Sequence, residues 1–195
     1  HKKFTKFAGD RDMFSVAWEN HREDIVNALI SLKYDVGYSL LLIASKLPQA
    51  DSYFSSLISS IRIDCDFKHK DEDERGILHH LARLKEESGF VSQHRIFTKK
   101  NSWIGSDSCG RTPSHELCRS RIHALAVIDR KLASSLLQLG DCPFICDEQN
   151  HTAFYYALVN RRFNICDIYM SAYGKDCVLQ VYEPKENEKE NYSKK

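Results

Sequence analysis

Long apolar runs, a dominant charge and a dense cysteine framework are all missing from this sequence of 195 residues, and each absence excludes a class of protein. Apolar runs such as Leu40–Ala44 are far shorter than the roughly 20 residues that a membrane-spanning helix needs. The formal net charge is only +1, so no overall field favours nucleic acid or an anionic membrane. The seven cysteines are an odd number and are widely spread, as is typical of reduced thiols. We therefore expect a cytoplasmic or nuclear protein without a membrane span.

The residues that catalysis would need are also scarce. The eight glycines are scattered singly, so no glycine-rich loop can hold a phosphate. The segment His115–Arg119 begins like the zinc-binding helix of a metalloprotease, but Arg119 stands where the second histidine must be. Cys118 lies near His115, yet nothing suggests a third group to orient such a pair. We therefore expect no enzyme activity and no cofactor.

A zinc site is the one metal alternative. Cys142 and Cys146 have a spacing that zinc sites use, and Cys109 and His151 are candidates to complete a set of four ligands. A single cysteine pair is weak evidence, because ordinary loop thiols have the same spacing. The favoured interpretation is that these thiols pack in loops and bind no metal.

A local pattern that occurs twice is the most informative feature present. Residues 107–117 read DSCGRTPSHEL, and residues 147–157 read DEQNHTAFYYA. Asp107 can accept backbone N–H bonds in an Asx turn, and Gly110 can supply a positive φ. Thr112 followed by Pro113 is typical of a helix start. A unit that recurs at a near-constant period predicts stacked helix pairs instead of a closed globule.

This pattern resembles the ankyrin repeat. The residues that match the family's D-x-x-G-x-T-P-L-H pattern are Asp107, Gly110, Thr112, Pro113 and His115, with Ser114 in place of Leu. The segment Gly140–Pro143 resembles the family's G-A-D-P loop. The matches in the next unit are Asp147, Thr152, Phe154 and Ala157, with Asn150 for Gly and Tyr155 for His. Asparagine tolerates the left-handed backbone better than most residues, so Asn150 is a mild change.

The resemblance extends upstream with less regularity. Asp71–Ala82 is similar to the start of a further unit, with Gly76 where Thr belongs. His79, His115 and Tyr155 are spaced by 36 and 40 residues, against about 33 in a standard unit. We therefore expect insertions within units, at residues 88–93 and 119–124. Trp103 precedes the fourth loop, and we expect it to fill the seam between two units, although an exposed tryptophan there would be a binding anchor.

The resemblance implies an all-α ankyrin-repeat solenoid, in which helix-turn-helix units are joined by β-hairpin-like loops. We expect it to cover residues 8–178 in about five units: 8–36, 37–70, 71–106, 107–146 and 147–178. Residues 179–195 are polar and their charges are balanced, so we expect a disordered tail. Because the chain starts at His1 and not at methionine, we also expect it to be part of a longer protein.

In the ankyrin family, a partner lies across the concave face that loop tips and first helices form. The positions of this sequence that match the family's contact positions are Arg75, His80, Arg83, Arg111, Glu116, Arg119, His151, Tyr156 and Asn160. The four arginines face few carboxylates, Glu19 and Glu116, and forked guanidinium groups suit an acidic or phosphorylated peptide.

These observations lead to two functional hypotheses. The first is a non-catalytic protein–protein interaction domain that acts as a scaffold, a targeting arm or an inhibitor, with a transcription factor or a signalling protein as a candidate partner. The alternative is a nucleic-acid-associated module that uses the arginine-bearing face. The near-neutral charge and the lack of Lys/Arg runs argue against this alternative.

Overall fold

The structure is a computed structural model that describes residues 12–32, 36–46, 54, 57–58, 65–83, 97, 102–119 and 126–174. These residues are all-α. The helices are α1 (Met13–Glu19), α2 (Glu23–Ser31), α3 (Gly37–Lys46), α5 (Ile77–Arg83), α7 (Pro113–Arg119), α8 (Ala126–Leu139), α9 (Ala153–Val159) and α10 (Phe163–Tyr173). The expected tail at 179–195 and most of the expected insertions at 88–93 and 119–124 lie outside the described residues.

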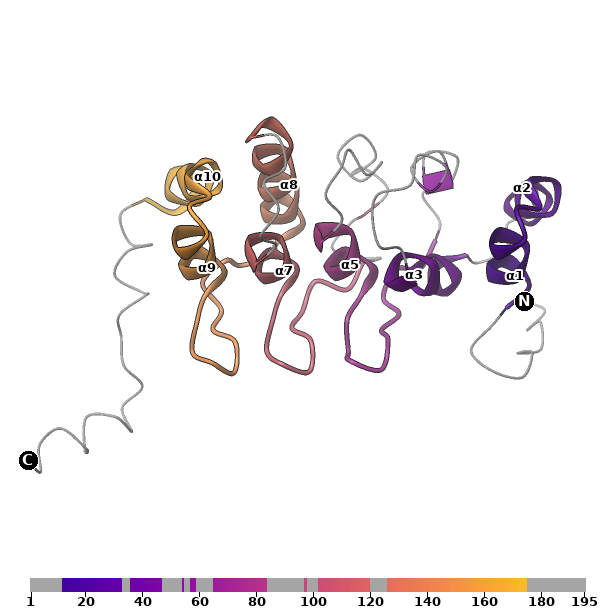
Figure 1. The fold of residues 1–195 in the computed structure, drawn as a ribbon, viewed down its shortest axis with the longest axis horizontal. Helices are drawn as coiled ribbons and strands as arrows, with labels where there is room; N and C mark the ends of the chain where they lie inside the picture. The colour runs from indigo at the N-terminus through magenta and orange to yellow at the C-terminus, as the bar shows by residue number, and fades with distance from the viewer. Residues whose placement is uncertain are drawn as a thin grey trace, which may run out of the picture.

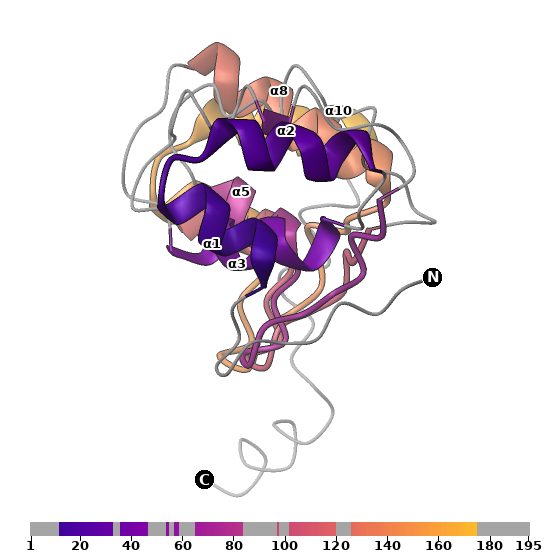
Figure 2. The same ribbon diagram turned by 90° about the vertical axis from the view of Figure 1, so that its right-hand side faces the viewer.

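The helices form a row two layers deep. Helices α1, α3, α5, α7 and α9 lie side by side in one layer, and α2, α8 and α10 lie in the other (Figure 1). The end-on view shows the same two layers, with the long loops extending together from the edge of the first (Figure 2). Each first-layer helix packs against the next one along the chain, from α1 through α3, α5 and α7 to α9.

The connecting loops differ from the β-hairpin-like loops expected from the sequence. Among the described residues there is no β-strand, and only two isolated bridges occur: Phe67 with Ser102, and Cys146 with Thr152. The long loops are closed instead by turns and by side-chain hydrogen bonds. The physical reason is that the bonds which close each loop run within five residues, and a single backbone bond joins consecutive loops, so no ladder forms.

Helices α7 and α9 have only seven residues each, too few to be stable alone in water. Capping fixes their starts: the Thr152 hydroxyl accepts the Tyr155 N–H at 3.1 Å. The start of α7 is also held from the loop after α8, because an Asp141 carboxylate oxygen accepts the Ser114 N–H at 2.7 Å. Burial raises the pKa of Asp141 to about 6, although hydrogen bonds from Ser114 and Thr112 oppose this shift.

Packing supplies the rest of the stability. A single apolar cluster runs through the whole row between the two layers. Its most deeply buried members include Leu40, Leu81, Leu117, Leu136 and Ile165. Because each short helix contributes to a core that continues into both neighbouring units, no unit can bury its apolar face by itself.

A buried ion pair joins the last two helix pairs. Arg162 precedes α10, Asp129 lies in the first turn of α8, and both side chains are 3% exposed. The Arg162 Nε donates to Asp129 Oδ2 at 3.1 Å, one Nη donates to the other carboxylate oxygen, and the second Nη donates to the carbonyl oxygen of Leu117. One guanidinium group therefore fixes α7, α8 and α10 relative to one another.

We expect Asp129→Ala to lower the free energy of unfolding by about 3 kcal/mol or more, because it leaves the Arg162 guanidinium buried without its counter-ion. Urea denaturation measures this loss. The matched control is Asp24→Ala, since Arg22 and Asp24 form the same forked pair on the surface, at 3.0 and 2.7 Å. Solvent screens the surface pair, so the control should change little. Equal losses in the two variants would contradict this interpretation.

Candidate partner-binding surface

The three long loops share one hydrogen-bonding pattern that begins at an aspartate. In the middle loop, Asp107 Oδ1 accepts the backbone N–H of Cys109 at 2.9 Å and that of Arg111 at 2.8 Å. The Asp107 N–H in turn donates to the Arg111 carbonyl oxygen at 2.8 Å. The same three bonds recur, at distances of 2.8–3.0 Å, in the loops that begin at Asp71 and Asp147. The loops are therefore copies of one Asx-turn structure, as the sequence predicted for Asp107.

The fourth residue of each loop has a left-handed backbone. The φ angles are 61° at Glu74, 75° at Gly110 and 62° at Asn150. Glycine and asparagine favour this conformation, whereas glutamate does not. The hydrogen bonds of the loop hold Glu74 in it nevertheless, so the loop geometry does not depend on a glycine.

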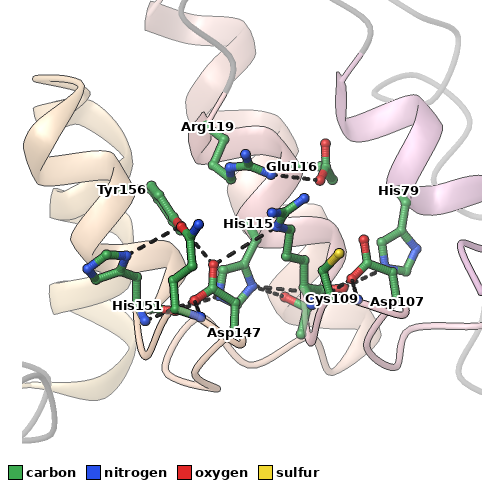
Figure 3. A network of polar contacts seen from close by, with 12 residues as sticks. His79, Asp107, Cys109, His115, Glu116, Arg119, Asp147, His151 and Tyr156 are labelled. Atoms are coloured by element: carbon green, nitrogen blue, oxygen red, sulfur yellow. Dashed lines mark hydrogen bonds and ion pairs between the residues drawn. The ribbon is translucent and has the colours of Figure 1, made fainter. Parts of the chain in front are cut away.

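Two histidines connect each loop to the next. His79 Nδ1 accepts the Gly76 N–H at 3.1 Å, and His79 Nε2 donates to the Arg111 carbonyl oxygen at 3.0 Å. His115 repeats this arrangement with the Thr112 N–H at 3.0 Å and the His151 carbonyl oxygen at 3.1 Å (Figure 3). Each ring therefore fixes the start of its own helix and the position of the following loop.

These bonds require neutral rings, because an imidazolium Nδ1 cannot accept a hydrogen bond. Burial lowers the pKa of His79 from its ordinary value of 6.5 to about 4, and burial also lowers the pKa of His115. The resulting neutral Nε2–H tautomer is the form that the two bonds of each ring need.

Two of the arginines expected on the partner-binding face contact the next loop. Arg75 Nε lies 3.5 Å from Asp107 Oδ2, and Arg111 Nε lies 4.0 Å from Asp147 Oδ2. Arg75 also pairs with Asp73 at 3.0 Å. The excess of positive charge on this face is therefore smaller than the sequence indicates. Besides Glu19 and Glu116, aspartates of the loops oppose these arginines.

In two of the loops the aspartate also bonds the side chain of the ninth residue after it. His80 Nε2 lies 2.8 Å from Asp71 Oδ2, and the Tyr156 hydroxyl donates to Asp147 Oδ2 at 2.7 Å. Burial lowers the pKa of His80, although Asp71 opposes this shift. Burial together with Asp147 raises the pKa of Tyr156 to about 12. His80 is only 3% exposed, so its ring offers almost no surface to a partner.

Glu116 is the ninth residue after Asp107, and there the pattern changes. Two carboxylates repel each other, so Glu116 pairs with Arg119 instead, at 3.6 Å on the same helix. The Arg119 guanidinium also lies over the Tyr156 ring of α9, 5.5 Å from its centroid. This change places a partly exposed ion pair against an aromatic ring.

Three residues expected at the partner-binding face, His151, Tyr156 and Asn160, belong to the next unit, and Tyr156 is the one whose ring lies against Arg119. The Tyr156 hydroxyl lies 3.5 Å from His151 Nδ1, and the His151 ring stacks on Tyr155 with 4.2 Å between centroids. Asn160 ends α9 and donates to the Cys118 carbonyl oxygen at 2.9 Å. We call Glu116, Arg119, His151 and Tyr156 the α7–α9 patch (Figure 3). Arg83 ends α5 and is exposed.

Trp103 lies where the sequence indicated, in the seam before the fourth loop. A Cβ atom at Gly76 would come within 2.9 Å of the Trp103 side chain, and one at Gly105 within 2.4 Å. The backbone N–H of Trp103 donates to the Phe67 carbonyl oxygen at 3.1 Å, and Lys70 Nζ lies 3.8 Å from the centre of the indole ring. Trp103 therefore explains why glycine replaces threonine at position 76.

The cysteines offer little chemistry in this structure. Over the ranges described, no three His, Cys, Asp or Glu side chains are grouped as a metal ion would require. Burial raises the pKa of Cys118 to about 12, the opposite of what a nucleophilic thiol needs. None of the helices in the described ranges is long and apolar enough to cross a membrane.

No family model matches the chain, and no curated protein matches it.

We expect the stability of the protein to fall between pH 6.5 and pH 4 through His79. The pKa of His79 in the folded chain, about 4, is below the ordinary 6.5, so the unfolded chain binds the proton first as the pH falls. This contribution is complete above pH 6.5 and is lost toward pH 4, by roughly 3 kcal/mol. His79→Gln should be less stable at pH 7 and should lose less on acidification.

Denaturant titrations at pH 7 and pH 4.5 measure both quantities. Ile77→Ala is the control, because it also destabilises the start of α5 but retains His79. It should therefore keep the acid sensitivity of the parent. If His79→Gln loses as much stability on acidification as Ile77→Ala, the histidine is not the cause.

Proposed function

We propose that this chain is a non-catalytic protein-interaction domain of the ankyrin-repeat type. The observation that carries the proposal is the register of the three loops. The Ser108 N–H donates to the Asp73 carbonyl oxygen at 2.9 Å, and the Glu148 N–H donates to the Cys109 carbonyl oxygen at 3.0 Å. The same bond therefore joins both pairs of consecutive loops, from the second residue of one loop to the third residue of the loop before it, which supports a stacked-repeat architecture with an extended surface over α5, α7 and α9.

The α7–α9 patch is the favoured contact point on this surface. It combines arginine, tyrosine and histidine side chains that are neither buried nor fully exposed, and arginine and tyrosine are enriched at binding hot spots. Bonds to neighbouring side chains already restrict Arg119 and Tyr156. A partner therefore has less side-chain entropy to overcome on binding.

The charges favour a protein partner over a polyanion. Arg75 and Arg111 are already opposed by loop aspartates, and Arg119 is opposed by Glu116. We propose a protein or peptide with a polar, mixed-charge contact surface, whose acidic or phosphorylated groups would meet Arg119 or Arg83. The same neutralisation argues against the nucleic-acid alternative, since phosphate binding depends on unopposed cations.

Scaffold, targeting and inhibitor roles all agree with this surface. The described cysteines are free thiols, which supports a reducing compartment such as the cytoplasm or the nucleus. A transcription factor or a signalling protein remains the proposed kind of partner.

The test is affinity capture from lysate with residues 1–195, followed by dissociation constants for the purified partner. We expect Arg119→Ala to weaken binding roughly ten- to thirtyfold, as truncation of an interface arginine does. Arg130→Ala is the control, because Arg130 is an exposed arginine of α8 in the other layer. Raising the salt concentration should weaken binding only slightly.

Two results would contradict the proposal. Equal binding by the parent and Arg119→Ala would exclude the α7–α9 patch as the contact point. A steep linear fall of the logarithm of affinity with the logarithm of salt concentration would instead indicate a polyanion partner.

A further inference from the structure

The repeat makes it possible to identify which side chains of the last described unit would face a following unit. Thr112 and Thr152 precede α7 and α9 at the same point of the pattern, so residues 40 apart correspond in the first helices. In the second helices, the buried positions Leu132, Ala133 and Leu136 of α8 match Ile165, Cys166 and Tyr169 of α10. Residues 33 apart therefore correspond in the second helices.

His115, Cys118 and Asp129 of the fourth unit are buried and contact the fifth. His115 bonds the His151 carbonyl oxygen, and Cys118 Sγ lies 3.6 Å from the Tyr169 hydroxyl. Asp129 pairs with Arg162. The counterparts of His115 and Cys118 one unit later are Tyr155 and Leu158, and that of Asp129 is Arg162, which is already paired with Asp129.

Together with exposed apolar residues of α10, Tyr155 and Leu158 form an apolar end face. Leu158 is 42% exposed and Phe163 is 60% exposed. Met170 follows Phe163 by two turns on the same side of α10 and is 40% exposed. We define the end face as Tyr155, Leu158, Phe163 and Met170. The terminal unit of a stacked array needs a polar outer surface to remain soluble, and this end face is not polar.

We propose that residues 175–182, KDCVLQVY, cover the end face as a C-terminal cap. The segment begins directly after α10, whose last two turns carry Met170. Five of its eight residues are apolar, whereas the thirteen residues that follow contain a single apolar residue, Tyr192. The apolar part of the C-terminal region is therefore confined to the stretch next to the end face.

The reach of the segment agrees with this assignment. Eight extended residues span about 26 Å, whereas packed helices lie about 8–10 Å apart. The chain can therefore pass α10 and reach α9. Gly174, with φ of 70°, can redirect the backbone at the end of α10 where other residues would be strained. Apolar side chains such as Leu179 would then take the place that the next unit takes elsewhere in the row.

A double-mutant cycle on the full chain tests the cap. Phe163→Ser and Leu179→Ser are made singly and together, and unfolding is followed in urea. Each single change should raise the unfolding equilibrium constant about tenfold, because each removes one side of an apolar contact. The double variant should be close to the single variants, since neither side then has a partner to lose.

Two controls accompany the cycle. Leu32→Ser replaces an exposed leucine at the opposite end of the row, and Gln180→Ser changes a polar residue of the segment itself. Both should shift the unfolding constant by no more than about twofold, as surface changes do. Hydrogen exchange provides a second measurement that needs no unfolding. Amides of residues 175–182 should be protected in the parent and should lose protection in Phe163→Ser.

Three outcomes would overturn the proposal. The first is that Phe163→Ser and Leu179→Ser have no more effect than the controls. The second is that their effects add fully in the double variant. The third is that the loss in Phe163→Ser depends on protein concentration while Leu179→Ser is neutral, because a second copy of the chain would then cover the end face.

Discussion

The stacking of this protein depends on one interaction, a neutral histidine ring held between the start of its own helix and the loop of the next unit. Helices α5 and α7 have seven residues each and cannot persist alone. His79 and His115 accept the backbone N–H of the residue just before each helix and at the same time bind a carbonyl oxygen of the next loop. Burial keeps the rings neutral, so the core and the hydrogen bonds depend on each other.

The chemistry of the exposed surface arises from departures in this internal pattern. Where the ninth residue after the loop aspartate can bond that aspartate, as His80 and Tyr156 do, the side chain is used inside the unit. Glu116 cannot do so, because both groups are carboxylates, and it turns to Arg119. The α7–α9 patch therefore exists because Glu116 departs from the repeat, while the neighbouring Tyr156 keeps to it.

Sequence reasoning succeeded where the determining contacts are local. The Asx turn at Asp107, the left-handed Gly110 and the start of α7 after Thr112 depend on bonds that span four residues or fewer. The pairing of Arg75 with Asp107 spans 32 residues, and that of Arg162 with Asp129 spans 33. Such contacts leave no local pattern, so the arginines appeared as free surface charge and the buried pair was not foreseen.

Irregular positions in the repeat are compensated by particular neighbours. Gly76 lacks the hydroxyl that Thr112 and Thr152 offer at a helix start, and Trp103 occupies the space that a side chain would need. The His79 ring accepts the Gly76 N–H, so the backbone group is still satisfied. In the last described unit, Tyr155 occupies the position of His79 and His115, and no further loop is described after it. The Tyr155 ring stacks on His151 instead of donating to a carbonyl oxygen. Departures from the regular repeat are therefore accompanied here by changes in nearby contacts, and comparing sequences position by position would score these coupled changes as unrelated.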